Sequence, residues 1–405
     1  MTENKLPEAE ECIKRFTELV SKIEETETVT LVEAYGRITA EDIYSGIDVP
    51  SFPRSAMDGY AVCAADISFA DRKHPKTLKV IGEIFAGDHK DIKYIPDTAV
   101  RIMTGGYIPD GYDCVIKQED TDYGEDHVNI YVSQKAYANY CPIGEDMKKG
   151  MLIAAKNTCI SMAHIGSFAS AGIVEVKVFK KLRTAFISTG NELVSPGDRL
   201  EKGKIYNSTL YMLAAVVKNK GCEVVCTEHA TDDENVLADI LKHCAGLADI
   251  VITTGGVSVG KKDILKCVLE NIGAKLLFTR VNIQPGTPTV GSVYKGIPII
   301  SLSGNPYAAL VNFELYFWEI AAFITGDSTF LCKKAKLPLV DNYNKVNAKR
   351  RFIRAYSDGK NVFLPEKNNA ASVISNTVNC NCFIDLEAGR RISAGDIVNI
   401  RYMKD

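Results

Sequence analysis

Three short apolar segments of this chain each end in a small loop of glycine, serine or threonine. They are Thr184–Gly190, Asp249–Gly256 and Ile297–Pro306, and a helical pattern follows each of them. In an open parallel sheet such loops lie together at the carboxyl edge of the strands, where ligands bind. Backbone N–H groups and helix N-termini directed at one point form an anion site, typically for phosphate. The sequence therefore predicts a pocket for a phosphorylated small molecule.

Acidic residues follow the predicted strands of the same region. They are Glu192, Asp232 and Asp263. Carboxylates beside phosphates bring like charges together unless a cation intervenes, and magnesium can bridge both kinds of oxygen. For Asp232 alone a helix N-cap is the stronger interpretation, and for Asp263 a cap explains the residue as well as a metal ligand does. The prediction of a magnesium site rests on all three acids together.

The loop after the second of these strands nearly matches a P-loop. The segment from Gly255 to Lys261 has the glycines and the lysine, but Lys262 stands where a serine or threonine would ligate magnesium. Because that ligand is missing, the match favours a phosphate-cradling loop over a nucleoside-triphosphate P-loop. A tight turn with glycines for packing alone is the alternative. A phosphotransferase that uses this loop is the weakest functional hypothesis.

Two further groups of residues are ambiguous by residue type alone. The segments Ser55–Tyr60 and Arg101–Gly106 are polar and rich in turn residues, and a β-turn is the favoured interpretation of Asp58-Gly59. The cations Lys349–Arg351 and Arg354 could form an anion site, but a solvated strand face is slightly favoured. None of the histidines lies in a catalytic pairing, so a Ser-His-Asp hydrolase is not supported.

The elements that must position these loops follow from periodicity. Strands alternate with helices from residue 181 onward, which predicts a doubly wound, mostly parallel α/β sheet. The predicted strands are 183–187, 223–227, 249–254, 275–279 and 298–302, and the predicted helices are 208–220, 233–244 and 264–271. Short strands with frequent turns predict β-rich regions at about 48–141 and after 333. Near the N-terminus we expect a helix over 6–25 and a strand over 29–34, and a further helix over 161–171.

Composition limits the class of protein. The 405 residues are 46% hydrophobic and 24% charged with a net charge of −3, which is typical of a soluble protein and argues against nucleic-acid binding. We expect no secretion signal and no membrane span, because the apolar segment Tyr307–Ile324 contains Asn312, Glu314 and Glu319 and is better explained as a buried helix. The 12 cysteines are scattered without a CxxC pair, which predicts free thiols in a reducing cytoplasm and no zinc.

Six motifs occur in this chain in an order known from one family. The chain resembles molybdopterin molybdenumtransferases, which are bacterial enzymes related to the C-terminal domain of gephyrin, over about residues 10–400. The motifs are Pro50–Ala61, Arg101–Gly105, Ile187–Leu193, Thr254–Gly260 with Asp263, Gln284–Pro288 and Ser303–Pro306, and Arg351–Ala355 and Asn381–Ile384 extend the likeness into the C-terminal region.

The resemblance implies an elongated homodimer whose subunit is a multidomain α/β and β protein. The implied domains are a mixed N-terminal domain of residues 1–47 plus 141–178, an inserted β-rich domain of 48–140, an α/β molybdopterin-binding domain of 179–328 and a C-terminal β-barrel of 329–405. It also implies that the active cleft lies between the α/β domain of one subunit and the inserted domain of the other. Acceptor apo-enzymes and other cofactor-biosynthesis proteins are further candidate partners.

The resemblance also implies an activity. Family members cleave adenylylated molybdopterin, insert molybdate at its dithiolene and release AMP, with magnesium. The implied catalytic residues are Asp58, Thr104, Glu192, Asp232 and Asp263, of which Glu192, Asp232 and Asp263 are the metal ligands. The implied binding residues for the pterin nucleotide are Thr189, Gly190, Gly255, Gly256, Ser258, Gly260, Gln284, Pro285, Gly286, Thr287, Pro288, Ser303, Gly304 and Asn305.

The sequence departs from the family pattern at groups that handle anions. Gln284 stands where lysine is usual, and Thr287 where a second lysine is common. No cation precedes Gly144 in the segment 139–143, and Ala370-Ala371-Ser372 replaces a glycine-serine step. A neutral side chain donates hydrogen bonds but lacks a full charge against an oxyanion. These departures leave open a non-catalytic pterin-binding scaffold or a tungsten-specific paralogue as the alternative function.

Overall fold

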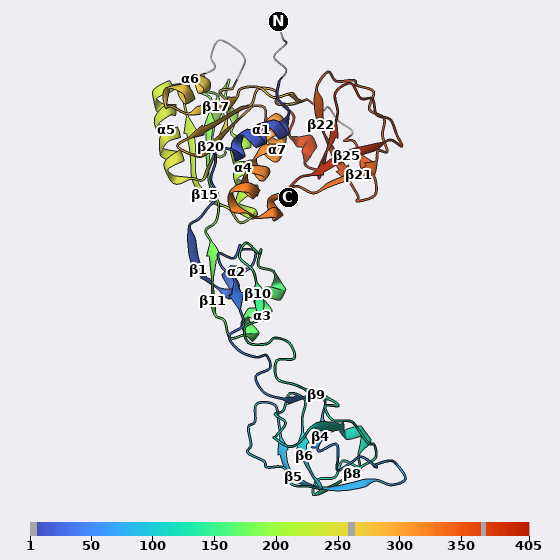
Figure 1. Ribbon diagram of the computed structural model, residues 1–405. Coiled ribbons are helices and arrows are strands. Elements are labelled where there is room, and N and C mark those ends of the chain that lie inside the picture. The colour runs from blue at the N-terminus through green and yellow to red at the C-terminus, as the bar shows by residue number, and fades with distance from the viewer. Residues whose placement is uncertain (1–5, 258–263, 366–369, 405) are drawn as a thin grey trace. The chain divides into compact units, whose positions relative to one another are not determined.

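The computed structural model describes residues 6–257, 264–365 and 370–404. The chain divides into two compact units (Figure 1), and each is described by itself. The first comprises Met1–Glu27, Gly36–Ile38 and Val178–Asp405, and the second comprises Thr28–Tyr35 and Thr39–Lys177. The predicted division into four domains stays a prediction.

A six-stranded sheet forms the centre of the first unit. Its strands, in order across the sheet, are β15 (Glu223–Ala230), β12 (Arg183–Thr189), β16 (Ile250–Thr254), β20 (Ile297–Leu302), β19 (Val290–Tyr294) and β17 (Lys275–Phe278). The first four are parallel, and β19 is antiparallel to both of its neighbours. The predicted mostly parallel sheet is therefore confirmed. Sequence reasoning missed β19 because all five of its residues are buried, which leaves no apolar–polar alternation to detect.

Helices cover both faces of this sheet because successive strand residues point to opposite sides. Ala185, Ile187, Val251 and Ile299 pack against α5 (Glu234–Leu247) and α6 (Ile264–Asn271). The alternate residues pack against α1 (Ala9–Thr17), α4 (Ser208–Asn219) and α7 (Pro306–Thr325). Figure 1 shows α5 and α6 on one side of the sheet and α1, α4 and α7 on the other. This two-sided arrangement is the predicted doubly wound architecture.

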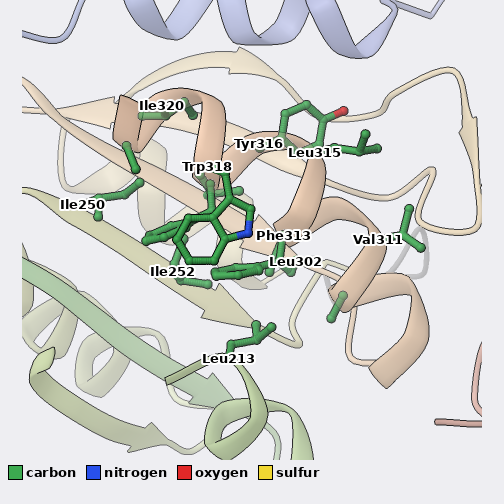
Figure 2. Close-up of a cluster of buried hydrophobic side chains, with 14 of the residues drawn as sticks. Leu213, Ile250, Ile252, Leu302, Val311, Phe313, Leu315, Tyr316, Trp318 and Ile320 are labelled. Atoms are coloured by element: carbon green, nitrogen blue, oxygen red, sulfur yellow. The ribbon is translucent and has the colours of Figure 1, made fainter. Parts of the chain in front are cut away.

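Helix α7 lies at the centre of the larger apolar core. Trp318 is fully buried against Phe313 and Phe317, with Ile250 and Ile252 of the sheet in the same cluster (Figure 2). In the described part of the chain α7 is the helix long and apolar enough to cross a membrane. However, 78% of its apolar 18-residue segment is buried inside the fold. Its burial agrees with the predicted core helix.

The N-terminal elements differ from their predictions. Helix α1 ends at Thr17 rather than near residue 25. The predicted strand 29–34 is instead β1 (Thr26–Thr30) followed by the single-turn helix α2 (Leu31–Ala34). A capping box explains the change, because the Thr30 N–H donates to Glu33 Oε2 at 3.2 Å and the Thr30 side chain binds the same turn. These local hydrogen bonds favour a helical turn, although the alternation of apolar and polar residues favours a strand.

A second sheet of the first unit follows α7 and includes one strand that precedes it. Its order is β18 (Ile283–Gln284), β22 (Arg350–Ser357), β24 (Cys382–Leu386), β25 (Ile397–Tyr402) and β21 (Lys334–Pro338), with β23 (Val362–Phe363) paired to β22. The predicted strands after residue 333 are present, and closure into a barrel stays a prediction. Because β18 pairs with β22, the loop after Gln284 is tied to the C-terminal region.

The second unit contains a five-stranded sheet and a smaller helical part. The sheet order is β7 (Cys114–Lys117), β4 (Gly59–Val62), β6 (Thr98–Ile102), β5 (Lys76–Ile84) and β8 (His127–Ile130), and β3 (Arg54–Ser55) pairs with β9 (Tyr140–Cys141). The smaller part holds α2, β2 (Ile43–Tyr44), β10 (Leu152–Ala154) and α3 (Met162–Ser170), whose N-cap is Ser161. The predicted helix 161–171 and the β-rich texture of 48–141 agree with these elements.

We expect Trp318→Ala to lower the free energy of unfolding of the first unit by about 3–5 kcal/mol, because it leaves a cavity in a packed core. Trp318 is the only tryptophan, so far-UV circular dichroism during urea unfolding is the suitable measurement. Val236→Ala, on the exposed surface of α5, is the control and should change the value by no more than about 0.5 kcal/mol. A loss at Trp318 as small as that of the control would contradict the assignment of α7 as the core helix.

Candidate functional site

Three loops meet at the carboxyl edge of the six-stranded sheet. The Thr189 hydroxyl donates to the Thr254 carbonyl at 3.2 Å, and the Gly255 N–H donates to the Leu302 carbonyl at 3.1 Å. A Cβ built on Gly304 would lie 3.7 Å from the Gly255 Cα. The structure therefore brings together the predicted binding residues Thr189, Gly190, Gly255, Gly256, Ser303, Gly304 and Asn305. Ser258 and Gly260, with the lysines of the near P-loop, lie outside the described residues.

Gly255 allows the closest of these approaches. Its φ is +90°, and a Cβ at this position would lie 2.3 Å from the Thr189 carbonyl oxygen. Any other residue would force the two loops apart, so glycine is required here by backbone conformation and by space. The requirement agrees with the alternative interpretation that this glycine serves the packing of the two loops.

The acids Glu192 and Asp232 lie on adjacent loops of this edge. A Cβ built on Gly190 would lie 2.6 Å from Glu192 Oε2, so the Glu192 carboxylate is folded back over the loop that follows β12. The Asp232 N–H donates to Asn191 Oδ1 at 3.3 Å, which joins the loop after β15 to the residue before Glu192. Both acidic side chains are exposed. Asp263 lies outside the described residues, so the structure describes two of the three predicted metal ligands.

The N-cap of α5 is Asp233, and the interpretation of Asp232 as that cap was wrong by one residue. Asp233 Oδ1 accepts from the N–H groups of Asn235 at 2.9 Å and Val236 at 3.1 Å. Aspartate is a preferred N-cap residue, so this preference cannot decide which of two consecutive aspartates caps the helix. Within the described residues the Asp232 carboxylate makes no hydrogen bond or ion pair, so it is available to a ligand.

The two exposed acids fit magnesium better than a structural metal. Magnesium in proteins keeps several waters and is held by one or two carboxylates together with substrate phosphates. Glu192 and Asp232 supply such hard oxygen donors at the edge where the glycine-bearing loops meet. In the described ranges no three histidine, cysteine or acidic side chains converge on one point, so a closed all-protein metal site is absent from that part of the chain.

The predicted binding loop Gln284–Pro288 is seated on α7. The buried Asn312 amide donates to the carbonyls of Gly286 and Ala308, each at 3.1 Å. Gly286 has a φ of +94°, and a Cβ there would lie 1.9 Å from Asn312 Nδ2. Asn312 therefore fixes this loop to the first turns of the helix that begins directly after Ser303, Gly304 and Asn305. Gln284 itself is exposed at the edge of β18.

Lys349 supplies a cation to this loop. Its Nζ donates to Thr287 Oγ1 at 3.2 Å, and the same hydroxyl donates to the Ile283 carbonyl at 2.6 Å. Sequence reasoning slightly favoured a solvated strand face for the Lys349 region. That reasoning missed the contact because the two residues are 62 positions apart and meet only through the pairing of β18 with β22.

Arg354 is fully buried, so the solvated strand face was the wrong interpretation for this residue. Its guanidinium lies 3.5 Å from the Tyr307 ring centroid, and its Nη2 donates to the Ala370 carbonyl at 2.9 Å. The Tyr307 N–H donates to the Ala371 carbonyl at 3.2 Å. Burial lowers the pKa of Arg354. Arg354 and Tyr307 together hold the segment around Ala370 beside the N-terminus of α7.

In the second unit, Asp58 and Thr104 form a direct pair. Asp58 Oδ1 accepts from the Thr104 N–H at 2.8 Å and from the Thr104 hydroxyl at 2.7 Å. These two hydrogen bonds lower the pKa of the Asp58 carboxyl below its ordinary value. The favoured interpretation of Asp58-Gly59 as an isolated β-turn was therefore incomplete, because the carboxylate also joins two motifs 46 residues apart. Their catalytic role stays a prediction.

We expect Thr104→Val to raise the pKa of Asp58, because the variant keeps the backbone donor and loses the hydroxyl. The native contribution of this pair to stability is present above the unfolded-state pKa and is lost as the pH falls through the lower folded-state value. NMR titration of the Asp58 carboxyl carbon measures the change directly. Thr77→Val, whose hydroxyl donates to Asn129 instead, is the control. An unchanged Asp58 pKa in Thr104→Val would refute the assignment of cause.

Three family models match this chain along most of its length. Residues 6–172 match the MoeA N-terminal region (domain I and II), residues 185–322 match a probable molybdopterin binding domain, and residues 336–401 match the MoeA C-terminal region (domain IV).

Full-length relatives show the same likeness. The molybdopterin molybdenumtransferase of Haemophilus influenzae is 35% identical over 385 residues, covering 93% of each chain. That of Bacillus subtilis is 34% identical over 414 residues, covering 100% of this chain and 96% of the relative. A solved structure of a molybdopterin biosynthesis MoeA protein from Pyrococcus horikoshii has a TM-score of 0.85 at 30% identity and covers 98% of this chain and 99% of its own.

Proposed function

The chain belongs to the MoeA family of molybdopterin molybdenumtransferases, and we propose that it inserts molybdate into adenylylated molybdopterin and releases AMP. One observation carries the proposal. Glu192 and Asp232 lie on adjacent loops at the sheet edge where three glycine-bearing loops meet. This combination of acids and backbone donors suits a pyrophosphate-linked nucleotide that binds with a magnesium ion.

The loops bind and orient the substrate. The small residues around Gly255 and Gly304 let phosphate oxygens approach the backbone closely, and the N-terminus of α7 adds its positive dipole end at the same place. Asn312 binds the Gly286 carbonyl and Arg354 binds the Ala370 carbonyl, so these two backbone positions are fixed without substrate. Preorganised donors of this kind stabilise charge that develops on oxygen without reorganisation during the reaction.

Glu192 and Asp232 would hold magnesium, with Asp263 as the third predicted ligand. Bound magnesium would neutralise charge on the pyrophosphate oxygens as the bond to AMP breaks. Both described carboxylates are exposed and unpaired with any cation of the described chain, so they can reach a metal together with substrate oxygens. Asp58 and Thr104 are proposed to act on the same substrate, as the family resemblance implies.

The alternative is a pterin-binding scaffold without catalysis or a tungsten-specific paralogue. The specific observation behind it is that Gln284 and Thr287 are neutral. The Lys349 Nζ donates to Thr287 Oγ1 at 3.2 Å, so a cation is present at this loop. This contact weakens the argument that the two neutral residues abolish anion binding. Assays with both molybdate and tungstate separate the metal specificities, and tight pterin-nucleotide binding without AMP release would select the scaffold.

We expect magnesium-dependent release of AMP when the protein is mixed with adenylylated molybdopterin and molybdate. Asp232→Asn and Glu192→Gln should each slow release by roughly 100-fold or more, because each removes a charged ligand from the metal while keeping the side-chain shape. Chromatographic measurement of AMP, with reconstitution of an apo-molybdoenzyme as a second readout, follows the reaction.

Asp239→Asn is the matched control for these variants. Asp239 lies on the exposed surface of α5, where its carboxylate is 3.7 Å from the Lys242 ammonium, and its loss should leave AMP release within about twofold. Release that does not depend on magnesium, or that is equally slow in Asp239→Asn, would count against the metal site. No turnover with molybdate or tungstate at any concentration would sink the transferase proposal.

We also propose that the chain is a homodimer in the reducing cytoplasm. The smaller part of the second unit carries exposed apolar side chains on and beside the elements α2 and α3. Val32 is 88% exposed, Met162 81% and Val174 75%. Burying such side chains against a second copy is favourable by the hydrophobic effect, and homodimers are the commonest oligomers.

Val32→Glu and Met162→Glu together should shift the protein toward a monomer, because two charges would then lie in an apolar contact. Light scattering coupled to size-exclusion chromatography, over a dilution series, measures the mass. Phe69→Glu is the control, since Phe69 is 92% exposed on the β-rich part of the same unit. A wild-type monomer at all concentrations would disprove the dimer, and a mass change in the control alone would place the contact elsewhere.

A further inference from the structure

Two cysteine side chains of the first unit are in direct contact through their sulfur atoms. The Sγ atoms of Cys226 on β15 and Cys244 on α5 are 3.2 Å apart. A disulfide bond has an S–S length of about 2.05 Å, so the two sulfurs need to approach each other by only about 1 Å to be joined. The fold therefore holds these two thiols in a position from which they can be linked.

An irregularity of the sheet turns Cys226 toward α5. In the parallel pairing of β15 with β12, two successive residues of β12 lie opposite Val224 and Cys226, so Val225 is an extra residue in β15. Val224 packs in the core on the side of α4, whereas Cys226 packs in the core on the side of α5. Residues two positions apart in a regular strand point to the same face, and an extra residue between them reverses this. The bulge therefore directs the Cys226 thiol at Cys244.

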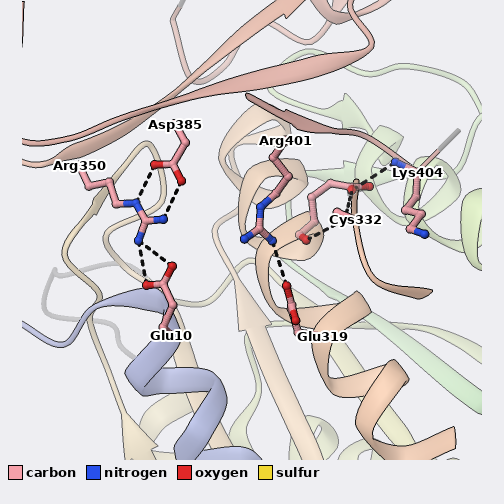
Figure 3. A network of polar contacts seen from close by, with 8 residues as sticks. Glu10, Glu319, Cys332, Arg350, Asp385, Arg401 and Lys404 are labelled. Carbon is pink, nitrogen blue, oxygen red and sulfur yellow. Dashed lines mark hydrogen bonds and ion pairs between the residues drawn. The ribbon is translucent and has the colours of Figure 1, made fainter. Parts of the chain in front are cut away.

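The buried thiol of Cys332 provides a contrast in the same unit. Its Sγ donates to Glu314 Oε2 at 3.6 Å, and the Lys404 N–H donates to the same oxygen at 3.3 Å (Figure 3). This thiol is one donor in a network of polar contacts. Cys226 Sγ likewise donates to a carboxylate, Glu228 Oε1 at 3.7 Å, but it has a second sulfur beside it as well. Cys226 therefore combines a proton acceptor with a partner thiol.

The two thiols differ in exposure. Cys226 is half-buried, whereas Cys244 is fully buried, so an oxidant in solution reaches Cys226 first. Burial raises the pKa of both thiols. Because the thiolate is the reactive form of cysteine, the raised pKa keeps the pair reduced at neutral pH until an oxidant is present in excess.

The pair encloses the loop that carries Asp232. Strand β15 ends at Ala230 and α5 begins at Glu234, so Asp232 lies between the two cysteines, which are 18 positions apart. A bond between the sulfurs would close this stretch of chain and fasten α5 to β15, the edge strand of the six-stranded sheet. Closing a loop of this length stabilises the folded state, chiefly by restricting the unfolded chain.

We propose that Cys226 and Cys244 form a redox-active dithiol that hydrogen peroxide converts to an intramolecular disulfide. The Cys226 thiol gives its proton to Glu228, and the thiolate attacks one oxygen of the peroxide. The O–O bond breaks, the other oxygen leaves as water with that proton, and Cys226 becomes a sulfenic acid. The Cys244 sulfur then attacks the sulfenic sulfur, and the S–O bond breaks with release of a second water that takes the Cys244 proton. The two thiols lose two electrons in total, and the peroxide gains them.

The test uses the full chain, first reduced with dithiothreitol and then treated with hydrogen peroxide after the reductant is removed. Mass spectrometry of peptides from alkylated protein identifies linked cysteines. We expect a peptide that contains Cys226 joined to one that contains Cys244, and separation of the two on renewed reduction. The Tm of the oxidised protein should exceed that of the reduced protein by roughly 5 °C or more. Hydrogen exchange of the backbone over residues 226–244 should slow as well.

Cys226→Ala and Cys244→Ala should each abolish the linked peptide and the rise in Tm. In Cys244→Ala the sulfenic acid on Cys226 lacks its partner thiol, so dimedone, which reacts with sulfenic acids, should label Cys226. Cys267→Ala is the matched control, because Cys267 is an exposed thiol on the neighbouring helix α6. Its loss should leave the disulfide and the rise in Tm unchanged.

The wild-type peptide map decides the question even if an alanine variant fails to fold. The proposal is overturned if Cys226 and Cys244 are both still free thiols after peroxide has oxidised the exposed Cys267. It is also overturned if either cysteine is linked to a different cysteine, or if the rise in Tm persists in folded Cys226→Ala. Formation of this disulfide needs no substrate of the proposed reaction, so the result is independent of AMP release.

Discussion

Burial of α7 is the constraint on which the candidate site depends. The helix lies in the core through Trp318 and its aromatic neighbours, and its first turns carry the contacts that order the surrounding loops. Asn312 holds the Gln284–Pro288 loop, the Tyr307 ring lies against the Arg354 guanidinium, and the Tyr307 N–H donates to the Ala371 carbonyl. A helix fixed by its apolar middle therefore gives its polar N-terminal end a defined position, which a ligand site built from loops requires.

The balance of charge separates structural groups from groups left for a ligand. Arg350 is satisfied by Asp385 and Glu10, and Asp233 is satisfied by the N-terminus of α5. By contrast, the carboxylate of Asp232 and the cations Lys349 and Arg351 have no partner of opposite charge in the described chain. The exposed Asp232 carboxylate is solvated by water, whereas the unpaired charges of the half-buried Lys349 and Arg351 are partly removed from water.

Much of the framework followed from local sequence pattern. Helix α6 ends at the predicted residue 271 and is helical from Ile264, the first described residue after the gap, and the predicted strands of the central sheet lie within about three residues of the observed ones. These elements are amphipathic or fully apolar, so their periodicity is visible in one sequence. Strand β19 was missed because all of its residues are buried, so it shows no alternation of apolar and polar residues. The single-turn helix α2 was missed because its capping box stabilises a helical turn in a segment whose apolar–polar alternation predicts a strand.

The sequence by itself determined the loops, the acids and the family, because glycine spacing and ordered motifs are local or collinear properties of the chain. It could not decide which charged groups remain free. That depended on contacts such as Lys349 with Thr287 and Asp58 with Thr104, which join residues 62 and 46 positions apart. Only the tertiary structure decides such contacts, since the free energy of a charge depends on which groups the fold places within hydrogen-bond distance of it.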